Sequence, residues 1–192
     1  MLHHVMEKVH APVSVSAFVA ANTAQVWAVL RARRAPLVHV NVSVVSVASA
    51  ASSQSWTVPL QLTANQPAPV VPVPLTFNVS EYVLVTSVDG GPETVHLLAL
   101  PRQLALPSPR PAVTAHTVAV TPSGVQVAVT NPSRSVAAWY VTVTTTYLGH
   151  FDHNVFHLAP LQSRTIVFAP APAVPQPDTP ENFDHTLHIA AL

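Results

Sequence analysis

Histidines are the residues of this sequence whose number and spacing could most readily support chemistry. The chain has 11 histidines against eight acidic and eight basic residues. Two groups of three lie close together in the sequence, the second beside Asp152: His3, His4 and His10, and His150, His153 and His157. A zinc site needs three or four such ligands converging in one pocket. Residues spread along a loop and a strand need not converge, so we predict no metal site and keep zinc binding by the second group as the alternative.

Other sites can be judged from short motifs. The chain has four glycines, of which only Gly90 and Gly91 are adjacent, so it lacks a glycine-rich phosphate loop. The G-x-S-x-G nucleophile motif does not occur either. Two N-x-S sequons make Asn41 and Asn78 possible N-glycosylation sites, and both fall on the polar face of a predicted strand. We predict no cofactor.

The composition excludes several classes of partner. Charged residues make up 8% of the chain, apolar residues make up 49%, and the formal net charge is zero. A neutral chain has no field to attract nucleic acid or anionic lipid. No apolar run is long enough to span a membrane, and the first ten residues lack the apolar stretch of a signal peptide. The absence of cysteine excludes disulfides and thiolate metal sites.

Alternation of apolar and polar residues dominates the sequence and is typical of antiparallel sheets. Val38, Val40, Val42 and Val44, for example, share one face. The pattern predicts strands near residues 13–19, 24–31, 38–44, 56–62, 75–79, 82–88, 95–99, 118–120, 125–130, 139–144, 166–168 and 187–189. Trp56 and Trp139 lie on apolar faces, so we expect both to be core residues.

The alternation stops once, in a segment with proline at positions 107, 109 and 111. Such a run cannot continue a strand ladder, and we interpret it as a boundary between domains. We predict an all-β chain of two tandem Ig-like antiparallel β-sandwiches. A short N-terminal helix precedes them, because Leu2, Val5, Met6 and Val9 form one helical stripe. Residues 169–181 are expected to form a proline-rich surface loop.

The most specific motif runs from residue 149 to residue 170. It resembles the G-x-F-S-D-N-x-F loop and R-T-x-x-F-x-P strand in the last domain of the β-mannosidases of glycoside hydrolase family 2. The matching residues are Gly149, Phe151, Asn154, Phe156, Arg164, Thr165, Phe168 and Pro170. Asp152 and His153 stand where the family has a Ser-Asp pair.

The resemblance reaches the start of the chain more weakly. In the family an L-H-Y segment and an R-R-x-x-A-P segment join the catalytic barrel to two Ig-like domains. The matching residues here are Leu2, His3, Ala11 and Pro12, whereas His4, Glu7 and Lys8 depart from the pattern. The resemblance implies that residues 1–10 are a remnant of the barrel's last helix. Residues 11–107 would be the first Ig-like sandwich, and residues 108–192 the C-terminal sandwich of β-mannosidase type.

The family's chemistry depends on two carboxylic acids, a nucleophile and an acid/base, about 5 Å apart. Both are glutamates of the barrel in this family. This chain has four glutamates, and none of them lies in such a motif: Glu7, Glu81, Glu93 and Glu181. We therefore predict no catalytic residue, and we expect Gly149, Phe151, Asn154, Phe156, Arg164 and Phe168 to be a structural motif. The loop would bury Phe151 and Phe156, and Asn154 would bond its backbone.

The resemblance implies a non-catalytic accessory region of a β-mannosidase, which removes terminal β-D-mannose from oligosaccharides and glycoproteins. Its partner would be the catalytic barrel, with an oligosaccharide as a further possible partner, and eukaryotic family members suggest a lysosomal or secreted location. A free-standing Ig-like carbohydrate-binding or adhesion module is the alternative, and an inactive truncated product is a third reading. A binding module should expose an aromatic patch, for which the candidates are Trp27, Tyr82, Tyr140 and Tyr147.

Overall fold

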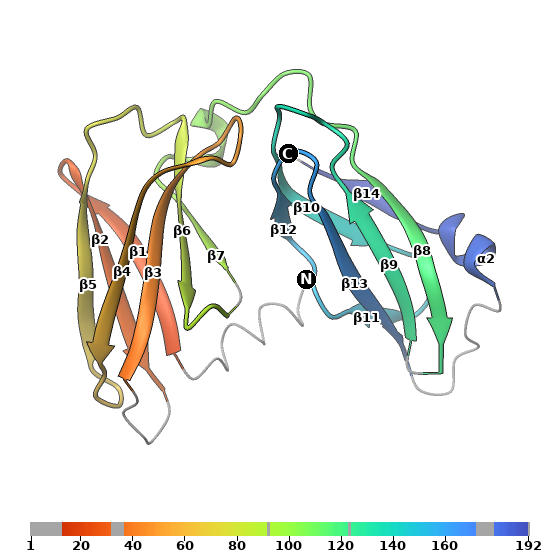
Figure 1. The fold of residues 1–192 in the computed structure, drawn as a ribbon, viewed down its shortest axis with the longest axis horizontal. Coiled ribbons are helices and arrows are strands. Elements are labelled where there is room, and N and C mark those ends of the chain that lie inside the picture. Colours follow the sequence, from red (N-terminus) through yellow and green to blue (C-terminus); the bar gives the residue numbers. More distant parts are fainter. Residues whose placement is uncertain (1–12, 32–36, 92, 123, 172–178, 192) are drawn as a thin grey trace. The chain divides into compact units, whose positions relative to one another are not determined.

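A computed structural model describes residues 13–31, 37–91, 93–122, 124–171 and 179–191 (Figure 1). The described chain is almost entirely strand, and the sheets are antiparallel, which confirms the predicted all-β class of Ig-like sandwiches. The predicted N-terminal helix at residues 1–10 lies outside the described residues. The described chain divides into two compact units, each with its own core. The first consists of residues 13–47 and 51–105, and the second of residues 106–191 together with Ala48–Ala50.

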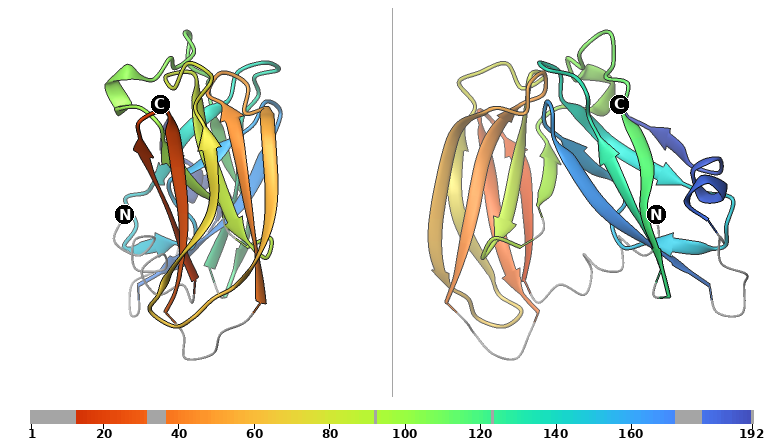
Figure 2. Two further views of the ribbon diagram at one scale, coloured as in Figure 1. Left: turned by 90° about the vertical axis from the view of Figure 1, so that its left-hand side faces the viewer. Right: turned by 45° about the vertical axis from the view of Figure 1, so that its right-hand side comes forward.

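The first unit is a sandwich of seven strands in two facing layers (Figure 2). One sheet has the order β1-β2-β5, and the other has the order β4-β3-β6-β7. The strands are β1 Val13–Ala20, β2 Thr23–Leu30, β3 Leu37–Ser46, β4 Ser52–Gln61, β5 Pro67–Pro74, β6 Tyr82–Val88 and β7 Thr94–Leu97, followed by a short 3-10 helix at Pro101–Gln103. Seven strands divided into sheets of three and four are typical of the immunoglobulin fold.

The second unit has the same division of seven strands. Its sheets have the orders β11-β13-β9-β8 and β12-β10-β14. The elements are β8 Thr114–Thr121, β9 Gly124–Thr130, β10 Ala138–Thr144, β11 Gly149–Phe151, β12 Phe156–Leu158, β13 Ser163–Pro170, α2 Pro180–Asp184 and β14 His188–Ala190. The short helix α2 begins at the end of the predicted loop, residues 169–181, and it packs beside the edge strand β8. No helix among the described residues is long and apolar enough to cross a bilayer.

The strand predicted at residues 75–79 is wrong, because the strand of this region is β5, Pro67–Pro74. Its prolines pair with alternate residues of β2, as Val29↔Pro67, Trp27↔Pro69, Gln25↔Pro72 and Thr23↔Pro74. A register shift between Val26 and Trp27 keeps this alternation in phase. β5 is an edge strand, and its prolines occupy alternate positions along it. The backbone N–H groups that these prolines lack would have pointed to the outer edge of the sheet, so the pairing with β2 is kept. The apolar residues Leu75, Phe77 and Val79 do pack on the core, but from an irregular segment.

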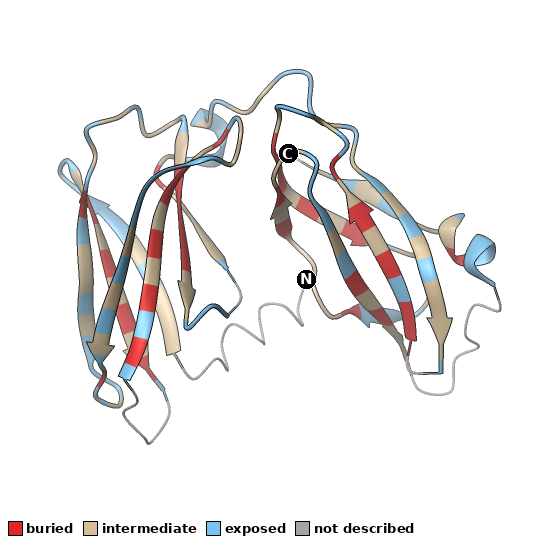
Figure 3. Ribbon diagram, in the orientation of Figure 1, coloured by how far each residue is buried: buried red, intermediate tan, exposed pale blue. Residues whose placement is uncertain are grey.

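The two tryptophans expected in the cores differ in burial. Trp139 is 1% exposed and so is buried as expected, but its ring stacks on His157 and lies outside the apolar cluster of the second core. Trp56 is only half-buried against the first core, because it lies on β4, an edge strand that is covered from one side. Figure 3 shows the alternation of buried and exposed positions along β3 and β9 that the sequence predicted.

Candidate functional site

The motif that the sequence singled out consists of part of the segment that joins β10 to β13, residues 145–162, and of the strand β13 that follows it. It contains the two short strands β11 and β12, which pair with β13 and β10 respectively. The rings of Phe151, the last residue of β11, and Phe156, the first residue of β12, are buried. Phe151 lies 5.3 Å from Phe168 between ring centroids, and Phe168 lies 5.2 Å from Phe183 of α2. The aromatic motif residues therefore build the centre of the second core.

Gly149 is required by close packing. A Cβ atom added at this position would lie 2.5 Å from Cζ of Phe168 and would also overlap the carbonyl oxygen of Ala169. Gly149 pairs with Pro170 at the start of β11, so a side chain there would push β11 away from β13. We infer that the glycine lets the chain return closely over the Phe168 ring.

Asn154 acts as a substitute for a strand residue beside β10. Its Oδ1 accepts a hydrogen bond from the backbone N–H of Val143 at 3.0 Å, and its Nδ2 donates to the carbonyl of Val143 at 2.9 Å. Oδ1 also accepts from the N–H of Val155 at 3.1 Å. Val155 has a φ of 61°, an unfavourable value for a β-branched residue. The carboxamide thus extends the ladder along β10 past Phe156, the first residue of β12, and holds a strained turn in place.

Asp152 performs the same task beside β13. Its Oδ1 accepts from the backbone N–H groups of Val167 and His153, both at 2.7 Å. The N–H of Asp152 donates to the carbonyl of Val167 at 2.8 Å. Asp152 stands where the family pattern has serine, and here its carboxylate bonds directly to the edge of the sheet.

Arg164 covers the buried ring of Phe156. Its guanidinium carbon lies 5.1 Å from the ring centroid, a cation–π arrangement. Arg164 lies on β13 opposite Val129 and is half-buried. The charge therefore lies over the Phe156 ring, as part of the packing around it.

Of the two histidine groups, the second lies in the described residues, and it does not converge. His150 is exposed on β11, and His157 on β12 stacks on Trp139 with 5.0 Å between ring centroids. Nδ1 of His153 is buried without a hydrogen-bond partner. Within the described ranges no three histidine or carboxylate side chains are grouped so that they could hold a metal ion. His3, His4 and His10 lie outside those ranges.

The glutamates are dispersed. Glu81 directly precedes β6 and Glu93 follows its far end, so the seven residues of β6 separate them by roughly 20 Å. Glu181 is exposed on α2 of the other unit. Glu81 and Glu93 are exposed too, and Glu7 lies outside the described residues. The pair in the first unit is far beyond the spacing of about 5 Å that retaining hydrolysis uses.

The four aromatic candidates for a binding patch are all partly buried. Tyr82 packs on Phe77 with 4.8 Å between ring centroids, and Tyr147 stacks on Phe183 at 5.6 Å. Burial raises the pKa of the Tyr140 hydroxyl. Trp27 pairs with Pro69 at the β5 register shift, and its indole N–H is buried without a partner. These four half-buried side chains therefore do not form an exposed aromatic patch.

The sequence reading missed two polar residues that matter to the second unit. Asn131 is fully buried, and its Nδ2 donates to the carbonyls of Val136, Leu158 and Ala159 at 2.8, 3.2 and 3.2 Å. Asp184 of α2 accepts from the backbone N–H and the hydroxyl of Thr117 on β8, both at 2.6 Å. The Asn-Pro dipeptide at residues 131–132 is typical of a turn, but it gives no sign that the amide is buried. Asp184 had no local signal.

Comparison with known proteins bears on both units. Residues 108–192 match the family Ig_mannosidase, an Ig-fold domain. The chain is similar in structure to a β-D-mannosidase from Dictyoglomus thermophilum, with a TM-score of 0.65 and 11% identity over 96% of this chain and 22% of that one. It is also similar to the exo-chitosanase CsxA of Amycolatopsis orientalis in complex with PNP-beta-D-glucosamine. There the TM-score is 0.57, with 15% identity over 96% of this chain and 26% of that one.

The chain thus spans about a quarter or less of the length of these enzymes. No curated protein sequence matches it significantly. At such low identity the structural similarity establishes the fold, whereas the family match rests on the sequence of the second unit and includes the whole motif from Gly149 to Pro170. Residues 108–192 are therefore an Ig-fold domain of the mannosidase family, which confirms the resemblance for this unit.

Proposed function

We propose that this chain is the C-terminal, non-catalytic accessory region of a β-mannosidase, an enzyme that releases terminal β-D-mannose from oligosaccharides and glycoproteins. The observation that carries the proposal is the use of the motif residues in the second unit. Asp152 and Asn154 bond to backbone groups of their own domain, and Arg164 lies on Phe156. A motif whose polar side chains bond within the domain serves packing and leaves substrate binding to another part of the enzyme.

The partner that this role requires is a catalytic (β/α)₈ barrel with a pair of glutamates. The dispersed glutamates of the described residues support this assignment, since Glu81 and Glu93 lie at opposite ends of β6. The accessory region would then supply a rigid surface on which such a barrel packs. Mannose as the substrate follows from the family name alone and is part of the proposal.

The second candidate is a free-standing Ig-like module that binds carbohydrate. Sugar-binding surfaces use exposed aromatic rings as flat apolar platforms. Here Tyr82 and Tyr147 pack on Phe77 and Phe183. This packing favours the accessory region over the binding module.

Two measurements on the full chain separate the readings. An accessory region should release no nitrophenol from an aryl β-mannoside above the buffer rate, and calorimetric titration with β-linked mannose oligosaccharides should give no saturable heat. Turnover that survives repurification and is lost in Glu81→Gln or Glu93→Gln would show an enzyme. Saturable binding without turnover, lost in Tyr82→Ala or Tyr147→Ala, would show a binding module. Reading the coding sequence upstream of Met1 for a barrel with two catalytic glutamates tests the proposed partner.

A further inference from the structure

The chain contains three N-x-S triplets, at Asn41, Asn78 and Asn131, and the structure places them in three different environments. The sequence alone left Asn41 and Asn78 equivalent as glycan acceptors, because both satisfy the sequon. Asn131 has proline in the middle position, which removes it from the motif. Its geometry nevertheless provides an internal control for the other two.

Asn41 lies in the middle of β3, which is paired on both sides. It is opposite Thr57 of β4 and Ser87 of β6. Its Oδ1 accepts from the hydroxyl of Thr57 at 2.8 Å, and its Nδ2 donates to Oγ of Ser87 at 3.4 Å. The side chain is half-buried between these neighbours. A sugar on Nδ2 would have to displace a cross-strand contact at the centre of a four-stranded sheet.

Asn78 lies in the turn that precedes β6, and it is exposed. Its Oδ1 accepts from the hydroxyl of Ser80 at 2.9 Å and from the N–H of Ser80 at 3.2 Å. The N–H of Glu81 donates to the backbone carbonyl of Asn78 at 3.0 Å, which closes a tight turn. The sequon is therefore folded so that its asparagine and serine side chains touch each other in an exposed turn.

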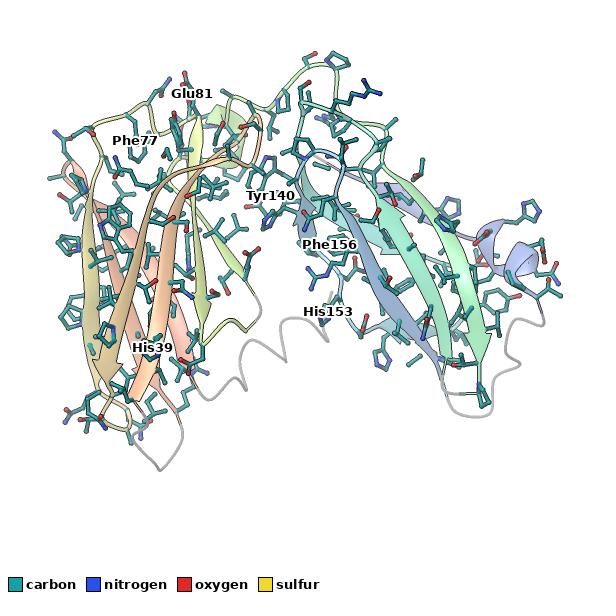
Figure 4. The ribbon with its side chains drawn as sticks, viewed as in Figure 1. His39, Phe77, Glu81, Tyr140, His153 and Phe156 are labelled. Carbon is teal, nitrogen blue, oxygen red and sulfur yellow. The ribbon has the colours of Figure 1, made fainter. Side chains whose placement is uncertain are left out.

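Nδ2 of Asn78 donates to Oε1 of Glu81 at 2.9 Å. Glu81 is itself exposed, and Figure 4 shows it at the end of the first unit where β6 begins. Water can replace a carboxylate at such a position at little cost, because exposed polar pairs contribute little free energy. Among the described residues, the reactive nitrogen of Asn78 is thus restrained only by its hydrogen bond to Glu81, which water can replace.

Asn131 shows that the turn alone would not suffice. Its Oδ1 accepts from the N–H of Ser133 at 3.1 Å, as that of Asn78 does from Ser80. Its Nδ2, however, bonds to backbone carbonyls inside a fully buried site. Two asparagines with similar local turns therefore differ entirely in the access to Nδ2, and exposure is what distinguishes Asn78.

We infer that Asn78 is the N-glycan acceptor of this chain and that Asn41 is not. The co-substrate is a polyprenyl-diphosphate-linked oligosaccharide. Nδ2 of Asn78 attacks C1 of the first sugar, the N–C1 bond forms, and the bond from C1 to the diphosphate oxygen breaks. Nδ2 loses one proton, and the polyprenyl diphosphate departs with the electron pair. This assignment is independent of the proposed function, since it depends only on the local environment of each sequon.

The test is expression of the full chain behind a cleavable secretion signal in a eukaryotic cell, with detection by mass spectrometry and by removal with a glycan-cleaving amidase. The wild type should carry one glycan. Asn78→Gln should abolish the mass shift, whereas the matched variant Asn41→Gln should keep it. Ser80→Ala should remove it and Ser80→Thr should retain it, because the hydroxyl at this position is part of the sequon.

Three outcomes would overturn the inference: a wild-type chain without glycan, a glycan that persists in Asn78→Gln, or a glycan lost in Asn41→Gln while that variant keeps its thermal unfolding transition. A chain with glycans at both positions would contradict the inference that Asn41 is not an acceptor. Circular dichroism of each variant shows that a lost glycan does not result from misfolding.

Discussion

The two sandwiches of this chain are built from the same number of strands but are held together differently. The first core consists of valine, leucine and alanine on regularly paired strands, and its buried polar residue is Thr86. The second core is centred on phenylalanine rings, with Phe168 and Phe183 fully buried and Phe151 and Phe156 beside them. Its edges are completed by side chains, since Asp152, Asn154 and Asp184 bond backbone groups of β13, β10 and β8.

The difference shows two ways in which a β-sandwich without disulfides can satisfy the backbone hydrogen bonds at its sheet edges. Long regular strands satisfy most of their backbone groups by pairing with each other, so the first unit uses few side chains for this purpose, such as Asp89, which accepts from the N–H of His39 on β3. Short strands such as β11 and β12 leave backbone groups unpaired, and each such group must find a partner. The second unit uses Asx side chains for this purpose. We therefore expect single polar substitutions to damage the second unit more than the first.

The largest expected effect is that of the buried tryptophan. Trp139→Ala should destabilise the second unit by about 3–5 kcal/mol, because it removes a fully buried ring and leaves a cavity. Trp56→Ala, on the half-buried edge strand, should cost about half as much. Denaturant unfolding of each variant, followed by fluorescence and circular dichroism, measures both values. Equal losses of stability in the two variants would show that the difference in burial between the two tryptophans has no energetic effect.

A smaller effect is expected from the buried amide. Asn131→Ala leaves three interior carbonyls without their donor and should cost about 2–3 kcal/mol, since unsatisfied buried groups are expensive. Asn78→Ala removes the same kind of turn from the surface and should cost below about 0.5 kcal/mol. Thermal unfolding of the two variants gives the contrast. A mild Asn131 variant would mean that the carbonyls find other donors.

The carboxylate beside β13 should matter at an intermediate level. Asp152→Ala removes the acceptor of two backbone N–H groups and should destabilise the second unit by about 1–2 kcal/mol. Asp152→Asn keeps an acceptor oxygen and should recover part of the loss. Glu81→Gln in the first unit is the control, and it should be close to neutral because Glu81 is exposed. Chemical denaturation measures the free energy of unfolding of all three variants. Equal values for Asp152→Ala and Glu81→Gln would show that Asp152 has no structural role.

The smallest expected effect is that of zinc. His150, His153 and His157 do not converge, so an excess of zinc should leave the melting temperature of the second unit unchanged. Differential scanning calorimetry with and without zinc provides the measurement. A rise of several degrees that disappears in His153→Ala would establish the metal alternative and make this unit a ligand-binding domain.

The pattern of the sequence predicted more of the fold than of the contacts. Alternation predicted β3 and β9 closely, because each of these strands has one apolar face against a core. It failed at β5, whose prolines mimic a loop. The pattern placed the strand at residues 75–79 instead, because Leu75, Phe77 and Val79 pack on the core although they form no strand.

For the candidate site, the motif residues were found by their spacing, but their roles depended on partners far away in the sequence. Asn154 bonds Val143, eleven residues earlier, and Asp184 bonds Thr117 across the whole domain. Nothing near Asp184 in the sequence indicates that its partner is an edge strand. Such bonds depend on which strand ends unpaired, and only the assembled sheet determines that.

The sequence by itself determined the all-β class, the alternation of buried and exposed residues, and the motif that links residues 108–192 to the mannosidase Ig-fold domain. These properties are local, since they follow from residue types at fixed spacing. The tertiary structure decided which of two identical sequons is exposed, which tryptophan is fully buried, and which carboxylates complete the sheets. The physical reason is that burial and backbone satisfaction are set by neighbouring strands, whose identity the chain settles only when it folds.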